Sequence, residues 1–326
     1  MKVFTNKGNK STSIGFGEGL LEAAEKNPNI VAIGADITHS VKVNAFAEKF
    51  PNRFFSMGIA EQNCVGVAAG FALTGKIPVF STYAVFSALR TTDQIRVSVC
   101  FNKLHVVIGG AHAGISVGPD GATHQALEDI AIMRVLPNMT VLSPCDAFQT
   151  KQITIAALTQ LNSPVYIRYG REAMPDFINA SIPFEIGKGQ LLKKGNDVSI
   201  IATGHLTWEA LQAAYELEKE NIHARVINIH TIKPIDQEII IQAAKDTGAI
   251  ITAEEHQIYG GLGSAVAEVL AQNCPITIEF IGVKDSFGES GKPLELMDKY
   301  GMTAKHIIDA VKRIRASRET EFELLG

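Results

Sequence analysis

Short apolar runs alternate with amphipathic stretches along the first half of the chain. Stretches such as 93–102 and 146–160 have the apolar spacing of helices that cover a core. The runs between them are rich in β-branched residues, and we expect the following to be buried strands: 30–36, 78–83, 104–110, 139–144 and 164–170. Buried strands separated by helices are typical of a mostly parallel sheet with helices on both faces.

The pattern breaks at 172–188, EAMPDFINASIPFEIGK, which has two prolines and little periodicity. A second alternating set follows, with strands expected at 197–204, 224–236, 248–256 and 277–283, and helices at 208–221, from about 263 and near 304–316. The sequence therefore predicts two doubly wound α/β domains with mostly parallel sheets and helices on both faces. Their expected limits are residues 1–180 and 189–326, with 172–188 as the linker.

Polar residues stand just after several of the predicted strands. Ligands of open α/β sheets bind beyond the carboxyl ends of the strands, so side chains at these ends are the first candidates for a site. The residues in such positions are Asp36, Tyr83, His112, Asp120, His124 and Arg171.

The segment FFSMGIAEQNCVGVAAGFALTG, at 54–75, predicts a closely packed helix with one carboxylate near its start. Gly66 and Gly70 have the GxxxG spacing that lets another backbone approach. Glycines inside a helix cost roughly 1 kcal/mol each relative to alanine, which a close contact would offset. Glu61 either favours the helix dipole or is held partly buried for proton transfer, and the residue pattern alone leaves both interpretations open.

Segments at the start of this helix and after it resemble the transketolase family. They are IAEQN at 59–63, FSTYAVFSALRTTDQIR at 80–96, AHAGISVGPDGATHQALEDIAIMR at 111–134, INIHTIKPID at 227–236 and AEEHQIYGGLGSAVAEVL at 253–270. From about residue 11 to 315, the chain resembles the pyrimidine-binding and C-terminal domains, which form the second half of a full-length transketolase. The resemblance implies a thiamine diphosphate enzyme that transfers a two-carbon ketol unit from a ketose to an aldose.

The resemblance implies four cofactor-binding residues. Glu61 matches the glutamate that hydrogen-bonds the aminopyrimidine ring of the cofactor and helps to activate it. Tyr83 matches an aromatic residue that stacks on this ring, and Phe86 matches a second aromatic residue nearby. Asp36 matches an aspartate near the cofactor. A dry setting would favour the protonated form of Glu61 and strengthen its hydrogen bond to the ring.

The resemblance also implies a set of substrate-binding residues. His112 and Arg171 match residues at the sugar-phosphate end of the substrate channel, and Ser40 matches a serine that contacts the phosphate. Asp120 matches an aspartate that contacts a substrate hydroxyl, and His124 a residue near the substrate carbonyl. No residue of this chain is expected to bind a metal ion. The expected catalytic residues are Glu61, His112 and His124.

The sequence departs from the family pattern in two places. Many transketolases have a phosphate-binding arginine where this chain has Ser13 or a neighbour, so the standard pentose-phosphate substrates are not assumed. No part of the chain resembles the diphosphate-binding domain. The resemblance therefore implies one subunit of a split transketolase, whose N-terminal partner subunit holds the diphosphate and its Mg²⁺ or Ca²⁺. We expect an α2β2 heterotetramer that acts on sugar phosphates, with the GxxxG helix in the subunit contact.

Composition adds limits on partners and compartment. The net charge of −4 does not favour nucleic acid or a membrane surface, and no apolar run approaches the roughly 20 residues that span a bilayer. The four cysteines lie far apart without a CxxC pair, which is typical of a reducing cytoplasm.

Three alternatives stay open. Beta subunits of 2-oxo acid dehydrogenases share the two-domain layout but lack the DGATHQ block found at 120–125. Deoxyxylulose-phosphate synthases have similar features but are usually one fused chain. A non-catalytic regulatory subunit would have a decayed site, which the intact Glu61, His112 and His124 argue against.

Overall fold

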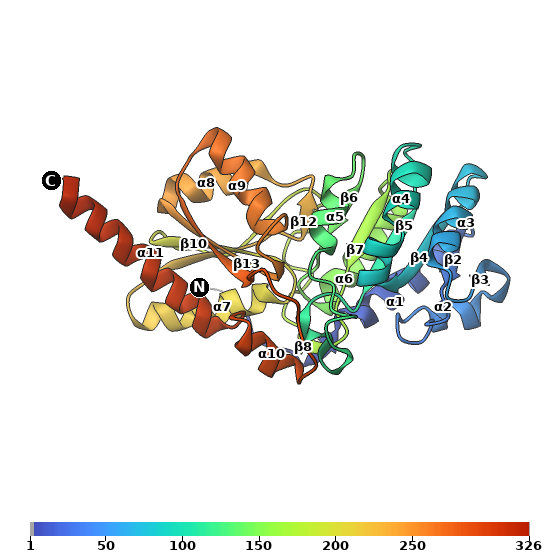
Figure 1. Cartoon of the computed structure of the whole chain (residues 1–326), viewed down its shortest axis with the longest axis horizontal. Helices are drawn as coiled ribbons and strands as arrows, with labels where there is room; N and C mark the ends of the chain where they lie inside the picture. The colour runs from blue at the N-terminus through green and yellow to red at the C-terminus, as the bar shows by residue number, and fades with distance from the viewer. Residues whose placement is uncertain (1–2, 326) are drawn as a thin grey trace.

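The computed structural model describes residues 3–325, with side chains from residue 3 to residue 317. The two halves of the chain lie side by side, each around its own sheet (Figure 1). Both sheets are mostly parallel and have helices on both faces, which confirms the predicted α/β class. In the described part of the chain, no helix is long and apolar enough to cross a membrane.

The first sheet has seven strands in the order β12-β6-β7-β5-β4-β2-β3. Its neighbours pair in parallel, except that β12 is antiparallel to β6. The strands, in chain order, are β2 Ile30–Gly34, β3 Phe54–Ser56, β4 Ile77–Tyr83, β5 Val107–Ala111, β6 Thr140–Leu142, β7 Val165–Arg168 and β12 Thr231–Lys233.

Strand β12 comes from the second half of the chain, so the segment 224–236 is not the single strand that its pattern predicts. Its first part forms β11, Ala224–Asn228, in the other sheet. The backbone then turns away, and the carbonyl of His230 accepts a hydrogen bond from the amide of Ser143 at 2.8 Å. This bond leads the chain onto β6, and the two sheets are thereby joined by backbone pairing.

Helices pack on both faces of the first sheet. On one face, glycines of α1 allow α6 to approach closely, because a Cβ atom on Gly15 would lie 2.1 Å from the carbonyl oxygen of Ala147. The other face is covered by α3, by α5 and by α4 with a π-helical turn on each side of it. The bounds are α1 Thr12–Lys26, α2 Asn44–Lys49, α3 Glu61–Leu73, π-turn Phe86–Arg90, α4 Thr92–Gln94, π-turn Ile95–Cys100, α5 Asp129–Val135 and α6 Ala147–Thr159.

The second sheet has five strands in the order β14-β13-β10-β11-β9, parallel except for β9. Helices α7 and α11 pack on one face, and α8 and α9 on the other. The strands are β9 Gln190–Lys193, β10 Val198–Ala202, β11, β13 Ala249–Gln257 and β14 Thr277–Val283. The helices are α7 Leu206–Lys219, α8 Gln237–Thr247, α9 Leu262–Asn273, α10 Pro293–Lys299 and α11 Ala304–Leu325.

The two halves share buried apolar surface as well as backbone bonds. One continuous cluster contains Ile33 and Phe80 of the first sheet together with Ile201 and Ile250 of the second. A short antiparallel pair, β1 Asn9–Ser11 with β8 Ala173–Pro175, lies where the first half ends. The second half can therefore act as a rigid support for loops of the first.

Candidate active site

Glu61 is the first residue of α3 and is almost completely buried, with 3% of its surface exposed. Its Oε1 accepts a hydrogen bond of 2.8 Å from Nη1 of Arg90. The helix has no side-chain N-cap at Ala60, so a carboxylate here also favours the positive end of the helix dipole. Burial, and then the Glu61 carboxylate, raise the pKa of the Cys64 thiol to about 11, which makes that cysteine unreactive.

Arg90 links Glu61 to an aromatic cluster. It ends the π-helical turn Phe86–Arg90, directly after β4, and its guanidinium carbon lies 4.1 Å from the Phe86 ring centroid. The side-chain amide of Gln62 donates to the Arg90 carbonyl at 3.1 Å, which holds this turn against α3. Single π-turns are frequent at functional sites, and here the turn places a cation between a carboxylate and a ring.

Four rings stand together beyond Arg90. The Tyr83 ring lies 4.3 Å from His112 at an angle of 31°, and 5.8 Å from Phe86. His124 meets both Tyr83 and Phe86 edge-on, at 5.8 and 5.4 Å. The structure therefore brings together two predicted cofactor-binding residues and two predicted substrate-binding residues that come from separate segments of the sequence.

A cavity of about 480 Å³ opens beside this cluster. Five residues predicted from the sequence line it: Ser40, Tyr83, His112, Asp120 and Arg171. Four further residues complete the lining: Ser11, Ser13, Ile14 and Lys42.

His112 is the buried wall of this cavity, with 5% of its surface exposed and a left-handed backbone, φ 55°. Burial, and then the Arg171 guanidinium, lower the pKa of its imidazole to about 4, so the ring is neutral near pH 7. Its Nδ1 has no hydrogen-bond partner within the described part of the chain. Asp120 accepts a 2.8 Å hydrogen bond from Arg171 Nη1, which leaves the other guanidinium nitrogens available to a ligand.

The loop that carries His112, Asp120 and His124 is held by the second half of the chain. Glu255 of β13 accepts a 2.6 Å hydrogen bond from the amide of Ser116. Gly114 has φ 87°, and a Cβ atom there would lie 2.3 Å from the Glu255 carboxyl carbon. Helix α10 packs against the turn at 115–120. The loop is therefore built against a rigid surface that excludes any side chain at position 114.

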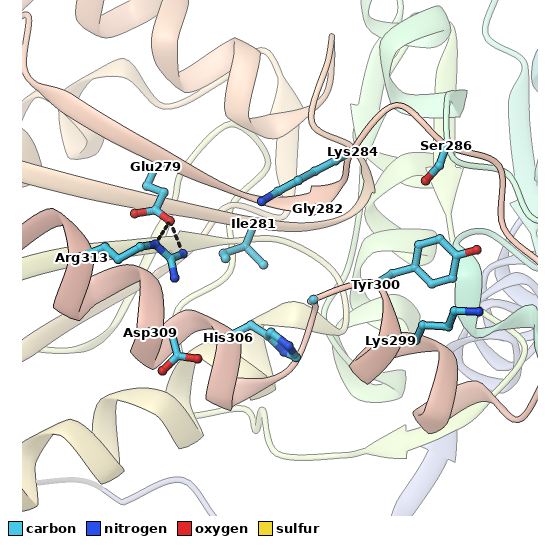
Figure 2. Close-up of a pocket in the computed structure, with 11 residues that line it drawn as sticks. Glu279, Ile281, Gly282, Lys284, Ser286, Lys299, Tyr300, His306, Asp309 and Arg313 are labelled. Atoms are coloured by element: carbon cyan, nitrogen blue, oxygen red, sulfur yellow. Dashed lines mark hydrogen bonds and ion pairs between the residues drawn. The ribbon is translucent and has the colours of Figure 1, made fainter.

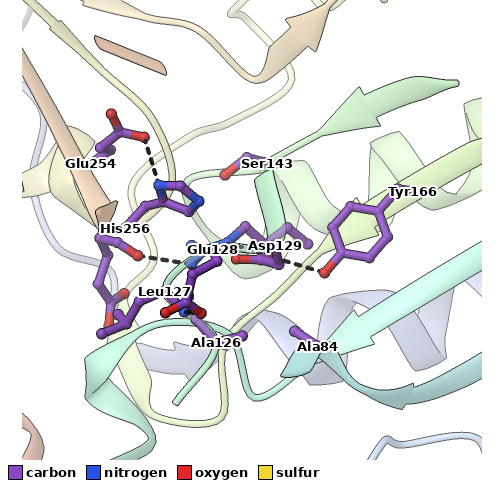
Figure 3. A network of polar contacts seen from close by, with 12 residues as sticks. Ala84, Ala126, Leu127, Glu128, Asp129, Ser143, Tyr166, Glu254 and His256 are labelled. Atoms are coloured by element: carbon purple, nitrogen blue, oxygen red, sulfur yellow. Dashed lines mark hydrogen bonds and ion pairs between the residues drawn. The ribbon is translucent and has the colours of Figure 1, made fainter. Parts of the chain in front are cut away.

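A buried polar network continues from this contact. Figure 3 shows Asp129 directed at Tyr166, whose hydroxyl donates a 2.8 Å hydrogen bond, and Arg168 Nε donates to Asp129 at 2.9 Å. Arg168 also donates to the backbone carbonyl of Glu255 at 2.8 Å. Burial alone would raise the pKa of the Glu255 carboxyl, but His205, whose Nδ1 lies 3.5 Å from Oε2, and the charge of Arg168 hold it below its ordinary value.

Sequence reasoning missed two charged residues of the site and placed one residue more centrally than the structure does. The missed residues are Lys42, which lines the cavity together with the predicted Ser40, and Arg90, which pairs with the predicted Glu61. No apolar pattern in the sequence distinguishes either of them from other surface charges. Asp36 is exposed, follows β2 with φ 65°, and is not among the residues that line the cavity.

The structure also contains a cavity outside the group of predicted residues. It has about 540 Å³ and lies between β14, α10 and α11 (Figure 2). Its charges are largely neutralised locally, since Arg313 pairs with Glu279 and Lys299 pairs with Glu289. None of the residues predicted from the sequence lines it.

The helix that begins at Glu61 has an open face. Added Cβ atoms on Gly66 and Gly70 would meet nothing within 4 Å, so no backbone in the described part of this chain uses the GxxxG spacing. Exposed apolar side chains lie on α3 and on the neighbouring segments: Ile59, Leu73, Leu89, Val97 and Phe101.

Both halves of the chain match known protein families. The family model of the transketolase pyrimidine-binding domain matches residues 9–176, and that of the transketolase C-terminal domain matches residues 187–307. A Clostridium protein, the 6-deoxy-6-sulfo-D-fructose transketolase subunit, is 42% identical over 90% of this chain and 91% of its own length.

Two further relatives extend this comparison. An apulose-4-phosphate transketolase subunit of Phocaeicola vulgatus is 40% identical over 90% of this chain and 93% of its own length. A solved structure described as a split gene transketolase, inactive beta4 tetramer, is 48% identical, covers 95% of this chain and 99% of its own, and superposes with a TM-score of 0.86.

Proposed function

This chain belongs to the transketolase family, and we propose that it is the C-terminal subunit of a split enzyme that transfers a two-carbon ketol unit from a ketose to an aldose. The observation that carries the proposal is a continuous line of side chains. It runs from the buried Glu61 carboxylate through Arg90 and the Phe86 and Tyr83 rings to the cavity that contains Arg171.

Glu61, Phe86 and Tyr83 fit the aminopyrimidine half of thiamine diphosphate. A carboxylate with 3% exposure has one side-chain hydrogen-bond partner in the described part of the chain, the half-exposed Arg90. That partner can turn to solvent and leave Glu61 to hold a proton at the ring nitrogen. The two aromatic rings beside it offer faces for a heterocycle. When bound, the cofactor would supply a carbon nucleophile for the ketose carbonyl, which is the chemistry that cleavage of the adjacent carbon–carbon bond requires.

The histidines and charged residues orient the sugar in this proposal. His112 stays neutral and presents its unpartnered nitrogen Nδ1 to a substrate oxygen, while His124 lies over the same rings. Asp120 accepts from a substrate hydroxyl, and Ser40 and Arg171 contact the terminal anion. Asp36 remains a proposed cofactor neighbour on the grounds of resemblance alone. The names of two relatives, one for a sulfo-sugar and one for a sugar phosphate, favour a substrate with an anionic end.

The cofactor diphosphate and its Mg²⁺ or Ca²⁺ are assigned to an N-terminal partner subunit. The open Gly66 and Gly70 face of α3 starts beside Glu61 and is the proposed contact surface, which places the partner next to the cofactor. We propose an α2β2 heterotetramer. By analogy with the inactive beta4 tetramer of the 48% identical relative, homo-oligomers of this chain should have no activity.

The test is reconstitution with the N-terminal subunit encoded beside this chain. The mixture receives thiamine diphosphate, Mg²⁺, and a panel of ketose donors and aldose acceptors, and each chain is assayed alone as the control. Ketol transfer that requires both chains supports the proposal. Release of carbon dioxide from pyruvate or another 2-oxo acid, without ketol transfer, would instead place the protein with the 2-oxo acid dehydrogenases or the deoxyxylulose-phosphate synthases. Assembly without any turnover would indicate a regulatory subunit.

A further inference from the structure

The cavity contains a cation that neither the motifs nor the resemblance identified. Lys42 lies in the loop after β2, between Val41 and Val43, whose side chains are buried in the core. The Val41 carbonyl also accepts a hydrogen bond of 3.4 Å from the Tyr169 hydroxyl. This alternation of buried and exposed residues directs Lys42 away from the core, on the side where the cavity opens.

The backbone of Lys42 is held in place by α1. Lys42 has a left-handed conformation, φ 61°, and a Cβ atom on Gly17 would lie 2.3 Å from its carbonyl oxygen. Only glycine at position 17 allows the loop to lie this close to the helix. Ser11 caps the start of the same helix and Ser13 lies in its first turn, and their hydroxyls are 2.7 Å apart and line the cavity. Lys42 and these hydroxyls are thus brought together by one packing contact.

The polar groups of the cavity are left with unused hydrogen-bonding capacity. Lys42 makes no ion pair with any residue that the structure describes, whereas Arg171 shares one nitrogen with Asp120 at 2.8 Å. The buried Nδ1 of His112 has no partner among the described residues, and buried polar atoms in proteins are nearly always satisfied. An anionic ligand with several acceptor oxygens would use these groups together.

We propose that Lys42 is the principal cationic ligand for the terminal anion of the sugar, and that the cavity is matched to a single negative charge. The inference rests on the proposed ketol transfer and specifies its substrate class. Lys42 and Arg171 contribute two positive charges, Asp120 contributes one negative charge, and His112 is neutral. One net positive charge balances a sulfonate, whereas a doubly charged phosphate monoester leaves an uncompensated charge in a partly enclosed site.

The residue type agrees with this charge balance. Lysine is a compact point charge on a flexible stem and makes no demand for the planar, two-pronged contact that arginine makes with a phosphate. The first helix contributes only the hydroxyls of Ser11 and Ser13 and the Ile14 side chain to the cavity, so the cation comes from the loop that packs on that helix. The cavity therefore accepts tetrahedral anions of different chemistry and discriminates among them mainly by charge.

The experiment uses the reconstituted complex with three donors: a ketose 6-phosphate, the matching 6-sulfonate, and the ketose without an anionic group. The variants are Lys42→Met, which keeps the length without the charge, and Lys42→Arg, which keeps the charge. Lys245→Met, an exposed lysine of α8 in the other half of the chain, is the matched control.

We expect Lys42→Met to raise KM for both anionic donors about 10- to 100-fold and to leave KM for the uncharged ketose within about twofold of wild type. Lys42→Arg should recover most of the loss, and Lys245→Met should show none. For wild type, KM for the sulfonate should be no higher than KM for the phosphate at about pH 7.5. Between about pH 7.5 and pH 6 the ratio of the phosphate KM to the sulfonate KM should fall, because the second pKa of a phosphate monoester is about 6.

His112 has a pKa of about 4 and therefore stays neutral between pH 7.5 and pH 6. The charged groups that line the cavity, Lys42, Arg171 and Asp120, face the phosphate and the sulfonate at the same place, so the change in the ratio follows the charge of the donor. Ketol transfer with an unchanged KM in Lys42→Met would overturn the inference and leave the proposed function intact. If no donor reacts, the proposed function fails, and the role of Lys42 is then tested only by anion binding to the isolated chain. Stabilisation of the isolated chain by methanesulfonate in thermal unfolding must then be lost in Lys42→Met and retained in Lys245→Met, and equal stabilisation of all three proteins would overturn it.

Discussion

The two ends of the candidate cleft are built in different ways. At one end, the Glu61 carboxylate is held by a single arginine that is 43% exposed, and the adjoining helix face is uncovered. At the other end, the loop with His112 and Asp120 is fixed by a buried bond to Glu255 and by glycine contacts with the second half of the chain. The proposed substrate end is thus held within one chain, whereas the helix face beside the proposed cofactor end is uncovered in the described part of the chain. This difference is what the proposed split enzyme would require.

The largest expected effect belongs to the cofactor end. Glu61→Gln keeps the shape of the side chain but cannot hold a proton at the ring nitrogen, so turnover of the reconstituted complex should fall about 100-fold or more. Steady-state assays measure the fall, and size-exclusion chromatography should show unchanged assembly. Glu48→Gln, an exposed glutamate of α2, serves as the control. Full turnover in Glu61→Gln would remove the proton-transfer role.

Two adjacent glutamates of β13 allow a test of whether the second half of the chain supports the loop that carries His112 and Asp120. Both should contribute to stability, but only one of them binds this loop. Glu255 binds the Ser116 amide, while Glu254 accepts from the amides of Leu262 and Gly263 at the start of α9. Replacing either buried carboxylate by leucine leaves buried amides without acceptors, and should lower the free energy of unfolding by about 3 kcal/mol in urea titrations.

The two leucine variants should nevertheless differ in their effect on the substrate. Glu255→Leu releases the loop that carries His112 and Asp120, so KM for the sugar should rise. Glu254→Leu disturbs the start of α9 and leaves the hydrogen bond between Glu255 and the Ser116 amide in place, so KM should stay near wild type. Equal KM values in the two variants would contradict the supporting role of the second half of the chain.

The sequence alone predicts those features of the site that depend on the ends of strands. The buried runs locate β2, β4, β5 and β7, and the rule that ligands bind at their carboxyl ends selects Tyr83 and His112 before any coordinates are known. The position of Glu61 at a helix start also follows from the pattern of 54–75. These features depend on periodicity that is local in sequence.

Other features depend on contacts between distant residues and leave no local signal. The three-residue strand β12 looks like a continuation of β11, and its pairing with β6 is decided by tertiary packing. Lys42 reaches the cavity only because Gly17 accepts its backbone, and Arg90 reaches Glu61 only through a π-turn. The role of Glu255 as a support for the loop likewise requires knowledge of which segment packs on β13.

Substitution of a glycine should have opposite consequences on the open face of α3 and on the packed face of α1, and the expected effect is smaller than at Glu61 or Glu255. Gly70→Leu should leave the isolated chain as stable as wild type or up to about 1 kcal/mol more stable, since leucine is the better helix former and its Cβ meets no atom. Assembly with the partner subunit should weaken about tenfold or more, as analytical ultracentrifugation can measure. Gly17→Ala should have the opposite effect, because the added Cβ would collide with the Lys42 backbone and destabilise the isolated chain. Normal assembly of Gly70→Leu would place the partner elsewhere.

The smallest expected effect concerns the titration of the substrate end. His112 has a pKa of about 4 in the folded chain, against about 6.5 when unfolded, so between these values the unfolded chain binds more protons. The histidine therefore lowers stability as pH falls from about 6.5 towards 4 and has no effect above that range. His112→Asn should reduce the loss of unfolding free energy between about pH 7 and pH 5.5 by about 1 kcal/mol, and His223→Asn, at an exposed histidine, is the control variant.

The same titration can connect His112 to its ligand. An anion bound beside Lys42 and Arg171 would offset the guanidinium charge that helps to lower the pKa of His112. In methanesulfonate, the wild-type chain should then lose less stability on acidification than in chloride at equal ionic strength, and His112→Asn should show no such difference. If the two salts give identical pH profiles, the imidazole does not sense the anion, and the cavity and the ring cluster are separate sites rather than one cleft.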